Sequence, residues 1–215
     1  MQGTDGIRGD TRAASTPEFR GLSPQRVFLE HGFLTDAFME LYAYAHVSTL
    51  LKKGEIRPRD GIAVGWDPRD VGGRFNEAVV RGVRRAGADA WVLGIVPTPL
   101  IPLYLQYKNA GGGFMVTASH NPKDQNGIKT FLAFRGLKLL PDNDAELTRT
   151  LLALDFKRLV KRPLRGKRLD RRREARSFFL RFSLDPENSW IEPDQTFDDI
   201  TLVVDPAHGS LSGLA

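Results

Sequence analysis

The sequence contains no cysteine among its 215 residues, which excludes both disulfide bonds and thiolate metal sites. It has no apolar run long enough to cross a bilayer, and its first residues lack the charged-then-apolar pattern of a signal peptide. It also has no internal repeat, which excludes a repeat architecture. The chain is long enough to bury the core of one α/β domain and part of a second, and its expected location is the cytoplasm.

Positive charge is concentrated in one segment. Residues 157–176 carry eleven Lys or Arg against Asp170 and Glu174, a local net of +9 in a chain whose total is +5. Such a segment can bind nucleic acid through phosphates, but no aromatic side chains are interleaved with these charges and no nucleic-acid-binding motif accompanies them. We favour a solvated linker, with RNA or DNA binding as the alternative. Apolar residues at helical spacing follow and predict an amphipathic helix that bridges two domains: Ala175, Phe178, Phe179 and Phe182.

Apolar patterns typical of strands and of helices alternate along the first 155 residues. Three short apolar runs predict strands, at residues 62–64, 90–93 and 113–116. Two stripes at helical spacing predict helices that end at a glycine, residues 38–51 before Gly54 and residues 75–86 before Gly87. This alternation predicts the fold class, which is α/β: a three-layer α/β/α domain with a mixed, mainly parallel sheet, followed by the start of a second α/β domain.

Further local signals complete the expected architecture. Thr98 is a candidate N-cap, with Pro99 in the first helical position. Residues 129–134 and 137–140 predict a hairpin joined by the two residues between them. Asp142 is expected to cap a helix whose inward side chains are Leu147, Leu151 and Leu154. The expected boundaries are 1–155 for the first domain, 156–185 for the basic linker and bridging helix, and 186–215 for the start of the second domain.

The most informative stretch is residues 117–122, Thr-Ala-Ser-His-Asn-Pro, followed by Asn-Gly-Ile-Lys at residues 126–129. It follows an apolar strand, and its Asn, Pro and Asn-Gly residues are turn-forming types, so the segment is expected to bend. Ser119 would then lie just past the carboxyl end of a strand, where open α/β sheets bind ligands. A solvated surface loop is the alternative that this composition allows.

The residue types in this stretch suit a covalently held phosphoryl group. A serine hydroxyl is a weak nucleophile until it is placed, deprotonated and surrounded by positive charge. A phosphoryl group on Ser119 would bring a charge of about −1.5 to −2 and three acceptor oxygens, for which His120 and Lys129 are candidate donors. Arg8 lies between glycines, where a tight turn lets a guanidinium approach an anion, and a surface arginine at a flexible terminus is the alternative.

A second polar turn occurs at residues 65–69. Asp67 and Arg69 flank Pro68 there, and an internal Asp-Arg bridge that holds the loop is expected rather than direct catalysis. Neither residue belongs to the expected catalytic set.

Residues 117–122 resemble the active-site serine loop of the α-D-phosphohexomutases, the superfamily of phosphoglucomutase, phosphomannomutase and phosphoglucosamine mutase. Four further segments resemble that superfamily in the same order along the chain: residues 3–9, 65–69, 97–99 and 203–209. The last of these resembles the opening strand of the family's second domain. The match to the serine loop is highly specific, whereas each of the other matches alone is weak. Their occurrence together in the family's order is hard to obtain by chance.

The resemblance implies a role for each matched residue. Ser119 would be the phosphoserine and, through its phosphoryl group, a ligand of Mg²⁺. His120 and Lys129 would act in acid/base and charge-stabilising roles. Arg8 would be a cation near the transferring phosphoryl group.

The chain also departs from the family pattern. Members hold magnesium with an Asp-Gly-Asp-Gly-Asp-Arg type of run in the second domain, and this chain has no such run. Its nearest acidic groups, residues 142–144 and 198–199, lack the alternating glycines and are interpreted as a helix start and a loop. We therefore expect the N-terminal region of a longer mutase, which binds Mg²⁺ weakly and has little or no activity alone.

The expected function is that of a phosphohexomutase, which interconverts a hexose 1-phosphate and 6-phosphate through a phosphoserine and a hexose bisphosphate intermediate. Residues 3–9 favour a glucosamine phosphate as substrate, with phosphomannomutase/phosphoglucomutase activity as the alternative. A non-catalytic module on the same fold, binding an anion or nucleic acid, is the alternative from another class. The expected partners are the hexose phosphate and the bisphosphate, and neither a membrane nor nucleic acid is expected.

Overall fold

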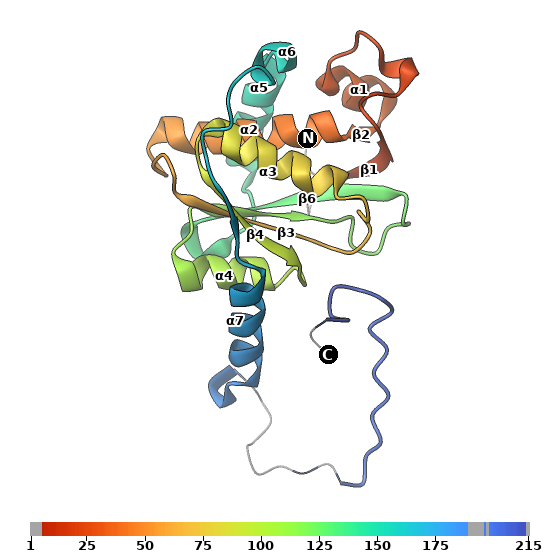
Figure 1. Ribbon diagram of the computed structural model, residues 1–215, viewed down its shortest axis with the longest axis vertical. Coiled ribbons are helices and arrows are strands. Elements are labelled where there is room, and N and C mark those ends of the chain that lie inside the picture. Colours follow the sequence, from red (N-terminus) through yellow and green to blue (C-terminus); the bar gives the residue numbers. More distant parts are fainter. Residues whose placement is uncertain (1–5, 189–195, 197, 214–215) are drawn as a thin grey trace.

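The computed structural model describes residues 6–188, 196 and 198–213. Its main body is a seven-stranded sheet in the order β2-β1-β6-β5-β3-β4-β7, with helices on both faces (Figure 1). Strand β6 is antiparallel to both of its neighbours, β1 and β5, and the other four pairs of neighbouring strands are parallel. The predicted mixed, mainly parallel sheet in an α/β arrangement is therefore confirmed.

The elements follow one another along most of the described chain. The strands are β1 (Ile7–Arg12), β2 (Leu34–Thr35), β3 (Gly61–Trp66), β4 (Asp89–Ile95), β5 (Gly112–Val116), β6 (Gln125–Leu132) and β7 (Arg168–Asp170). The α-helices are α1 (Pro24–His31), α2 (Asp36–Lys53), α3 (Arg74–Ala86), α4 (Leu100–Lys108), α5 (Pro141–Ala153), α6 (Phe156–Leu159) and α7 (Arg172–Leu184). Short 3-10 helices are η1 (Pro17–Phe19), η2 (Phe134–Gly136) and η3 (Pro186–Asn188). The predicted strands fall within β3, β4 and β5, and the two predicted helices are α2 and α3.

Two hydrophobic clusters lie on opposite faces of the sheet. Helices α2, α3 and α5 pack on the larger cluster, in which the ring of Tyr42 meets that of Phe114 edge-on at 6.4 Å. Helices α4 and α7 pack on the smaller one, in which Tyr104 lies 5.9 Å from Phe178. Neighbouring residues of a strand point to opposite faces, so Phe114 joins the first cluster and Met115 the second. The central strands β3 and β5 are therefore covered on both faces, and every residue of β5 is buried.

Helices α2 and α3 have local start and stop signals. The Thr35 hydroxyl accepts a hydrogen bond from the Phe38 N–H at 3.1 Å and caps the start of α2. Gly54 and Gly87 end α2 and α3 with positive φ angles of 72° and 115°, which a residue without a Cβ adopts at little cost. At the start of α3 the Asp70 carboxylate accepts the backbone N–H groups of residues 74–76. The predicted glycine stops are confirmed.

The predicted hairpin is wrong in its second strand. Strand β6 ends at Leu132, and η2 follows where a two-residue turn was expected. Arg135 adopts a left-handed φ of 54° inside this turn, and beyond it Lys138 makes a single bridge with Phe131. Hydrogen bonds from the Leu132 N–H to the Leu137 carbonyl and from the Leu139 N–H to the Thr130 carbonyl, at 2.7 and 3.3 Å, still join the two segments. The pairing stops at this one bridge, so residues 137–140 form no strand.

The predicted caps of two later helices also differ from those observed. Thr98 is not the N-cap of α4, because residues 97–100 first make a turn and the helix begins at Leu100 with no side-chain cap. Asp142 is not the N-cap of α5, which begins at Pro141. It lies in the first turn instead, where a carboxylate still interacts favourably with the helix dipole. The predicted inward residues Leu147 and Leu151 are buried.

The basic segment, residues 157–176, contributes a strand to the sheet. β7 pairs in parallel with β4, and the Arg168 guanidinium bonds to Glu77 at 2.8 Å. Arg171 pairs with Glu174 within the segment at 2.9 Å. Helix α7 follows and buries Ala175 and Phe178 in the smaller cluster, so the predicted amphipathic helix is present. Its bridging role and the domain boundaries at residues 155 and 185 stay predictions.

Residues 198–213 form an extended trace that turns back toward the main body at its end (Figure 1). Asp198 and Asp199 lie in a turn, as predicted. Within the described part of the chain, residues 201–206 form no strand, and Val203 and Val204 are exposed. A strand needs a neighbouring strand to take up its backbone hydrogen bonds, so the expected opening strand of the second domain is not present here. None of the described helices is both long and apolar enough to span a bilayer.

Candidate active site

The serine loop, residues 117–124, joins the end of β5 to the start of β6. Ser119 therefore lies past the carboxyl end of a central strand, as predicted. Its side chain is exposed, and its backbone adopts a left-handed φ of 56°. A residue that carries a Cβ seldom takes this conformation, and such residues cluster at functional sites.

Thr117 connects the serine loop to the end of β3. Its buried hydroxyl accepts the Ser119 N–H at 2.9 Å and donates to the Asp67 carboxylate. The Asp67 N–H in turn donates to the Val116 carbonyl at 3.1 Å. Strands β3 and β5 are neighbours, so the residues that follow their carboxyl ends meet and fix each other.

Arg69 makes the internal bridge that the sequence predicts. Its Nε donates to both carboxylate oxygens of Asp67, at 2.8 and 3.0 Å, and both side chains are largely buried. Its terminal nitrogens reach further than predicted, because they donate to backbone carbonyls of the serine loop and to that of Gln125. A charged side chain directly after a buried strand is the sequence signal for this contact, but the partner follows only from the adjacency of β3 and β5.

Arg8 and Lys129 lie on one face of the sheet. Arg8 pairs with Gly127 across β1 and β6, and Lys129 pairs with Met115 across β6 and β5. Residues two apart in a strand share a face, so both cations lie on the side that carries Met115. A Cβ at residue 127 would lie 2.2 Å from the Ile7 carbonyl oxygen and 3.1 Å from Arg8 Cγ, so this close packing requires glycine.

The predicted turn at residues 126 and 127 is therefore wrong, since both belong to β6. Asn126 closes its side chain onto the Gly127 N–H at 2.8 Å. The bend falls earlier, within the serine loop, where the Asn121 N–H bonds to the Ala118 carbonyl at 3.1 Å. The Asn-Gly pair therefore forms no turn, and its glycine allows β1 and β6 to pack closely beside Arg8.

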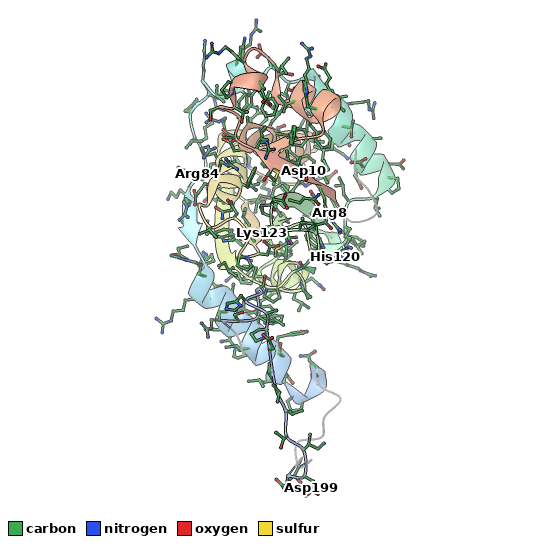
Figure 2. All side chains as sticks on the ribbon, turned by 90° about the vertical axis from the view of Figure 1, so that its right-hand side faces the viewer. Arg8, Asp10, Arg84, His120, Lys123 and Asp199 are labelled. Atoms are coloured by element: carbon green, nitrogen blue, oxygen red, sulfur yellow. The ribbon has the colours of Figure 1, made fainter. Side chains whose placement is uncertain are left out.

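A cavity of about 610 Å³ opens beside the serine loop. Its wall contains Ser119 together with two cations, Arg69 and Lys123, and with Met115. Of the four predicted site residues, Ser119 alone is among the described residues that line it. His120 is exposed next to Ser119, and Figure 2 shows Arg8, Lys123 and His120 in the same part of the main body.

The opposite wall of this cavity comes from residues 207–210. Ala207 and His208 both have positive φ angles, 48° and 54°, in the turn that presents this wall. The sequence assigns His208 no role, because nothing in its immediate neighbours signals a contact with a loop almost ninety residues earlier. Arg69, Lys123 and His208 are thus site residues that sequence reasoning does not identify.

The described residues do not form a complete magnesium site. They contain no cluster of three or more His, Asp or Glu side chains that could hold a metal ion. Asp67, the carboxylate in the cavity wall, already accepts hydrogen bonds from Arg69 and Thr117. Magnesium prefers six oxygen ligands in octahedral geometry, and the predicted ligand Ser119 supplies one position.

Comparison with known sequences places the whole first part of the chain in one family. The family model for phosphoglucomutase/phosphomannomutase, α/β/α domain I, matches residues 1–158. The phosphoglucosamine mutase of Xanthobacter autotrophicus is 31% identical over 208 residues, which is 97% of this chain and 40% of that protein. The phosphoglucosamine mutase of Syntrophomonas wolfei is 33% identical over 211 residues, covering 97% of this chain and 41% of that protein. The chain thus spans about two fifths of the length of these relatives.

Solved structures share the fold. A Thermus thermophilus protein assigned as a phosphomannomutase superimposes with a TM-score of 0.59 at 26% identity, over 87% of this chain and 36% of that one. The phosphoglucomutase parafusin of Paramecium superimposes with a TM-score of 0.54 at 19% identity, over 86% of this chain and 35% of that one. The second likeness concerns the fold alone.

Proposed function

Because this chain belongs to the phosphoglucomutase/phosphomannomutase family, we propose that Ser119 carries the transferred phosphoryl group of a phosphohexomutase. The supporting observation is the placement of Ser119 at the carboxyl end of β5, in the wall of a 610 Å³ cavity with Arg69 and Lys123. A phosphoserine there would bring a charge of about −2. The Lys123 ammonium in the same wall would offset part of it, whereas the charge of Arg69 is already paired with Asp67.

The reaction that we propose is two phosphoryl transfers. A hydroxyl of the hexose phosphate attacks the phosphorus on Ser119, the serine P–O bond breaks, and a hexose bisphosphate forms. The bisphosphate turns around, and the Ser119 oxygen takes its other phosphoryl group, which releases the isomeric hexose phosphate. Such transfers depend on positioning and on charge neutralisation.

His120, Lys129 and Arg8 have supporting roles in this proposal. Lys129 and Arg8, which share one sheet face, would stabilise the charge of the phosphoryl group as it moves. His120, which follows Ser119 directly, would exchange the proton of the reacting hydroxyl. A ligand of Mg²⁺ would be the phosphoryl oxygen on Ser119, and no step is assigned to the ion because the described residues supply no further ligand set.

The substrate that we propose is a glucosamine phosphate. Two relatives that each align with 97% of this chain are phosphoglucosamine mutases, whereas the solved structure at 26% identity is assigned as a phosphomannomutase, which makes a mannose or glucose phosphate the alternative. Because the chain spans about two fifths of these relatives, we propose little or no turnover by this chain alone. A phosphorylated sugar as substrate makes the cytoplasm the proposed location.

Phosphate uptake by this chain tests the proposal without requiring turnover. The chain is incubated with a hexose 1,6-bisphosphate and Mg²⁺, and its intact mass is compared with that of Ser119→Ala and of Ser177→Ala, a control at an exposed serine of α7. We expect one phosphoryl group on the wild-type chain and on Ser177→Ala, and none on Ser119→Ala. Equal labelling of all three chains, or none on the wild type, would contradict the proposal.

A further inference from the structure

Arg69 uses its guanidinium to hold a loop that is distant in sequence. Its Nη2 donates to the carbonyl of Ser119 at 2.6 Å. Its Nη1 donates to the carbonyls of Asn121, Pro122 and Gln125, at 3.3, 3.1 and 2.9 Å. One side chain thus gathers four carbonyl oxygens, from both ends of the bend, around a single cation.

These contacts exceed what the turn at residues 65–69 requires. The bond from Arg69 Nε to Asp67, and the Asp67 bond to the Arg69 N–H at 3.1 Å, already close that turn. The terminal nitrogens are left to reach the serine loop, and Asp67 fixes their direction by binding Nε on both oxygens. The planar guanidinium can make this set of bonds, whereas a lysine ammonium has three donors at one point.

The held loop contains the left-handed residue Ser119. Its φ of 56° turns the Ser119 carbonyl toward Arg69 and leaves its N–H bonded to Thr117. The C=O and the N–H of Ser119 are therefore both held by side chains, those of Arg69 and Thr117. Both of these side chains in turn donate to the carboxylate of Asp67. Strained backbone persists where its surroundings determine it in this way.

We infer that Arg69 is a positioning residue, which holds the backbone of Ser119 in its left-handed conformation and thereby aims the hydroxyl into the cavity. The catalytic role of this positioning rests on the proposed function, whereas the role of Arg69 in holding the loop does not. The clamp consists of Arg69, Asp67 and Thr117. Arg69 acts through the serine loop and forms no bond with the reacting atoms.

Hydrogen exchange measures the clamp directly. Arg69→Lys keeps the charge and removes the planar fork. The matched control is Arg74→Lys, since Arg74 lies five residues later, stacks its guanidinium on the Phe75 ring at 4.6 Å and donates to no carbonyl of the serine loop among the described contacts. We expect the hydrogen-bonded backbone amides of Ser119, Asn121 and Gln125 to exchange about tenfold faster or more in Arg69→Lys, with β3 and β4 unchanged.

Two exchange results would overturn the inference. Unchanged exchange in the serine loop would show that Arg69 does not hold it, and equal acceleration throughout the sheet would show a general structural role. If Arg69→Lys does not fold, Asp67→Asn replaces it, because the neutral amide no longer orients the guanidinium and the same confined acceleration is expected.

Phosphate uptake separates this inference from the proposed function. With a hexose 1,6-bisphosphate, we expect Arg69→Lys to take up phosphate on Ser119 at least about tenfold more slowly than wild type and Arg74→Lys. Equal rates in the variant and the wild type would overturn the positioning role. If the wild-type chain takes up no phosphate, the proposed function fails, and the exchange experiment still decides whether Arg69 holds the loop.

Discussion

His46 offers a test of the core that supports the site. It lies in α2 with 4% of its surface exposed, its ring meets the Phe114 ring edge-on at 5.5 Å, and its Nε2 has no hydrogen-bond partner among the described residues. Burial lowers the pKa of this imidazole from 6.5 to about 4. The cause is that the charged ring would lose its hydration and gain no partner in return.

The sign of the effect follows from proton binding. The unfolded chain protonates His46 near pH 6.5, whereas the folded chain keeps it neutral down to about pH 4. Between these values the unfolded state binds more protons, so the free energy of unfolding falls as the pH falls. The difference in pKa corresponds to about 3 kcal/mol of stability, present above pH 6.5 and lost by about pH 4.

Urea unfolding across this pH window, followed by tryptophan fluorescence, measures that loss. His46→Leu has a similar volume and does not titrate, so its unfolding free energy should fall by about 3 kcal/mol less than that of the wild type. His31→Gln is the control, because His31 is exposed, and it should follow the wild type. If wild type and His46→Leu show the same pH dependence, the reasoning about the buried ring is refuted.

Two other substitutions test the packing around the site. Thr117→Val removes the buried hydroxyl that bonds to Asp67 and to the Ser119 N–H, and should lower the unfolding free energy by about 1–3 kcal/mol in urea titrations; an unchanged midpoint would contradict that network. Gly82→Ala places a Cβ 2.3 Å from a backbone oxygen of α2 and should cost about 1–3 kcal/mol, although alanine favours helices. Gly72→Ala, which meets nothing within 4 Å, should be close to neutral, and equal effects of the two alanines would contradict the predicted close contact of α2 and α3.

The sequence predicts those parts of the fold whose signals are local. Helices α2 and α3 each combine an apolar stripe with a glycine stop, and both signals lie within the helix or one residue beyond it. Strand β7 has no such signal, since two of its three residues, Arg168 and Asp170, are exposed and charged. It exists because β4 lies beside it, and pairing between distant segments cannot be read from a short charged run.

The site likewise has parts that local sequence signals predict and parts that depend on contacts between distant segments. Ser119 is predictable because a polar, turn-forming stretch follows an apolar strand. The reach of Arg69 to the Ser119 carbonyl spans fifty residues and depends on β3 and β5 being neighbours. The cavity wall that contains His208 depends on the path of residues 198–213, for which the family resemblance predicts a strand that is not present here.

A crystal structure of the chain after incubation with a hexose 1,6-bisphosphate would show whether Ser119 accepts a phosphoryl group. We expect continuous density from the Ser119 Oγ to one phosphoryl group, which lies inside the cavity near Arg69 and Lys123, with the left-handed backbone of Ser119 retained. An unmodified Ser119, or a phosphoryl group attached elsewhere on the chain, would contradict the proposal.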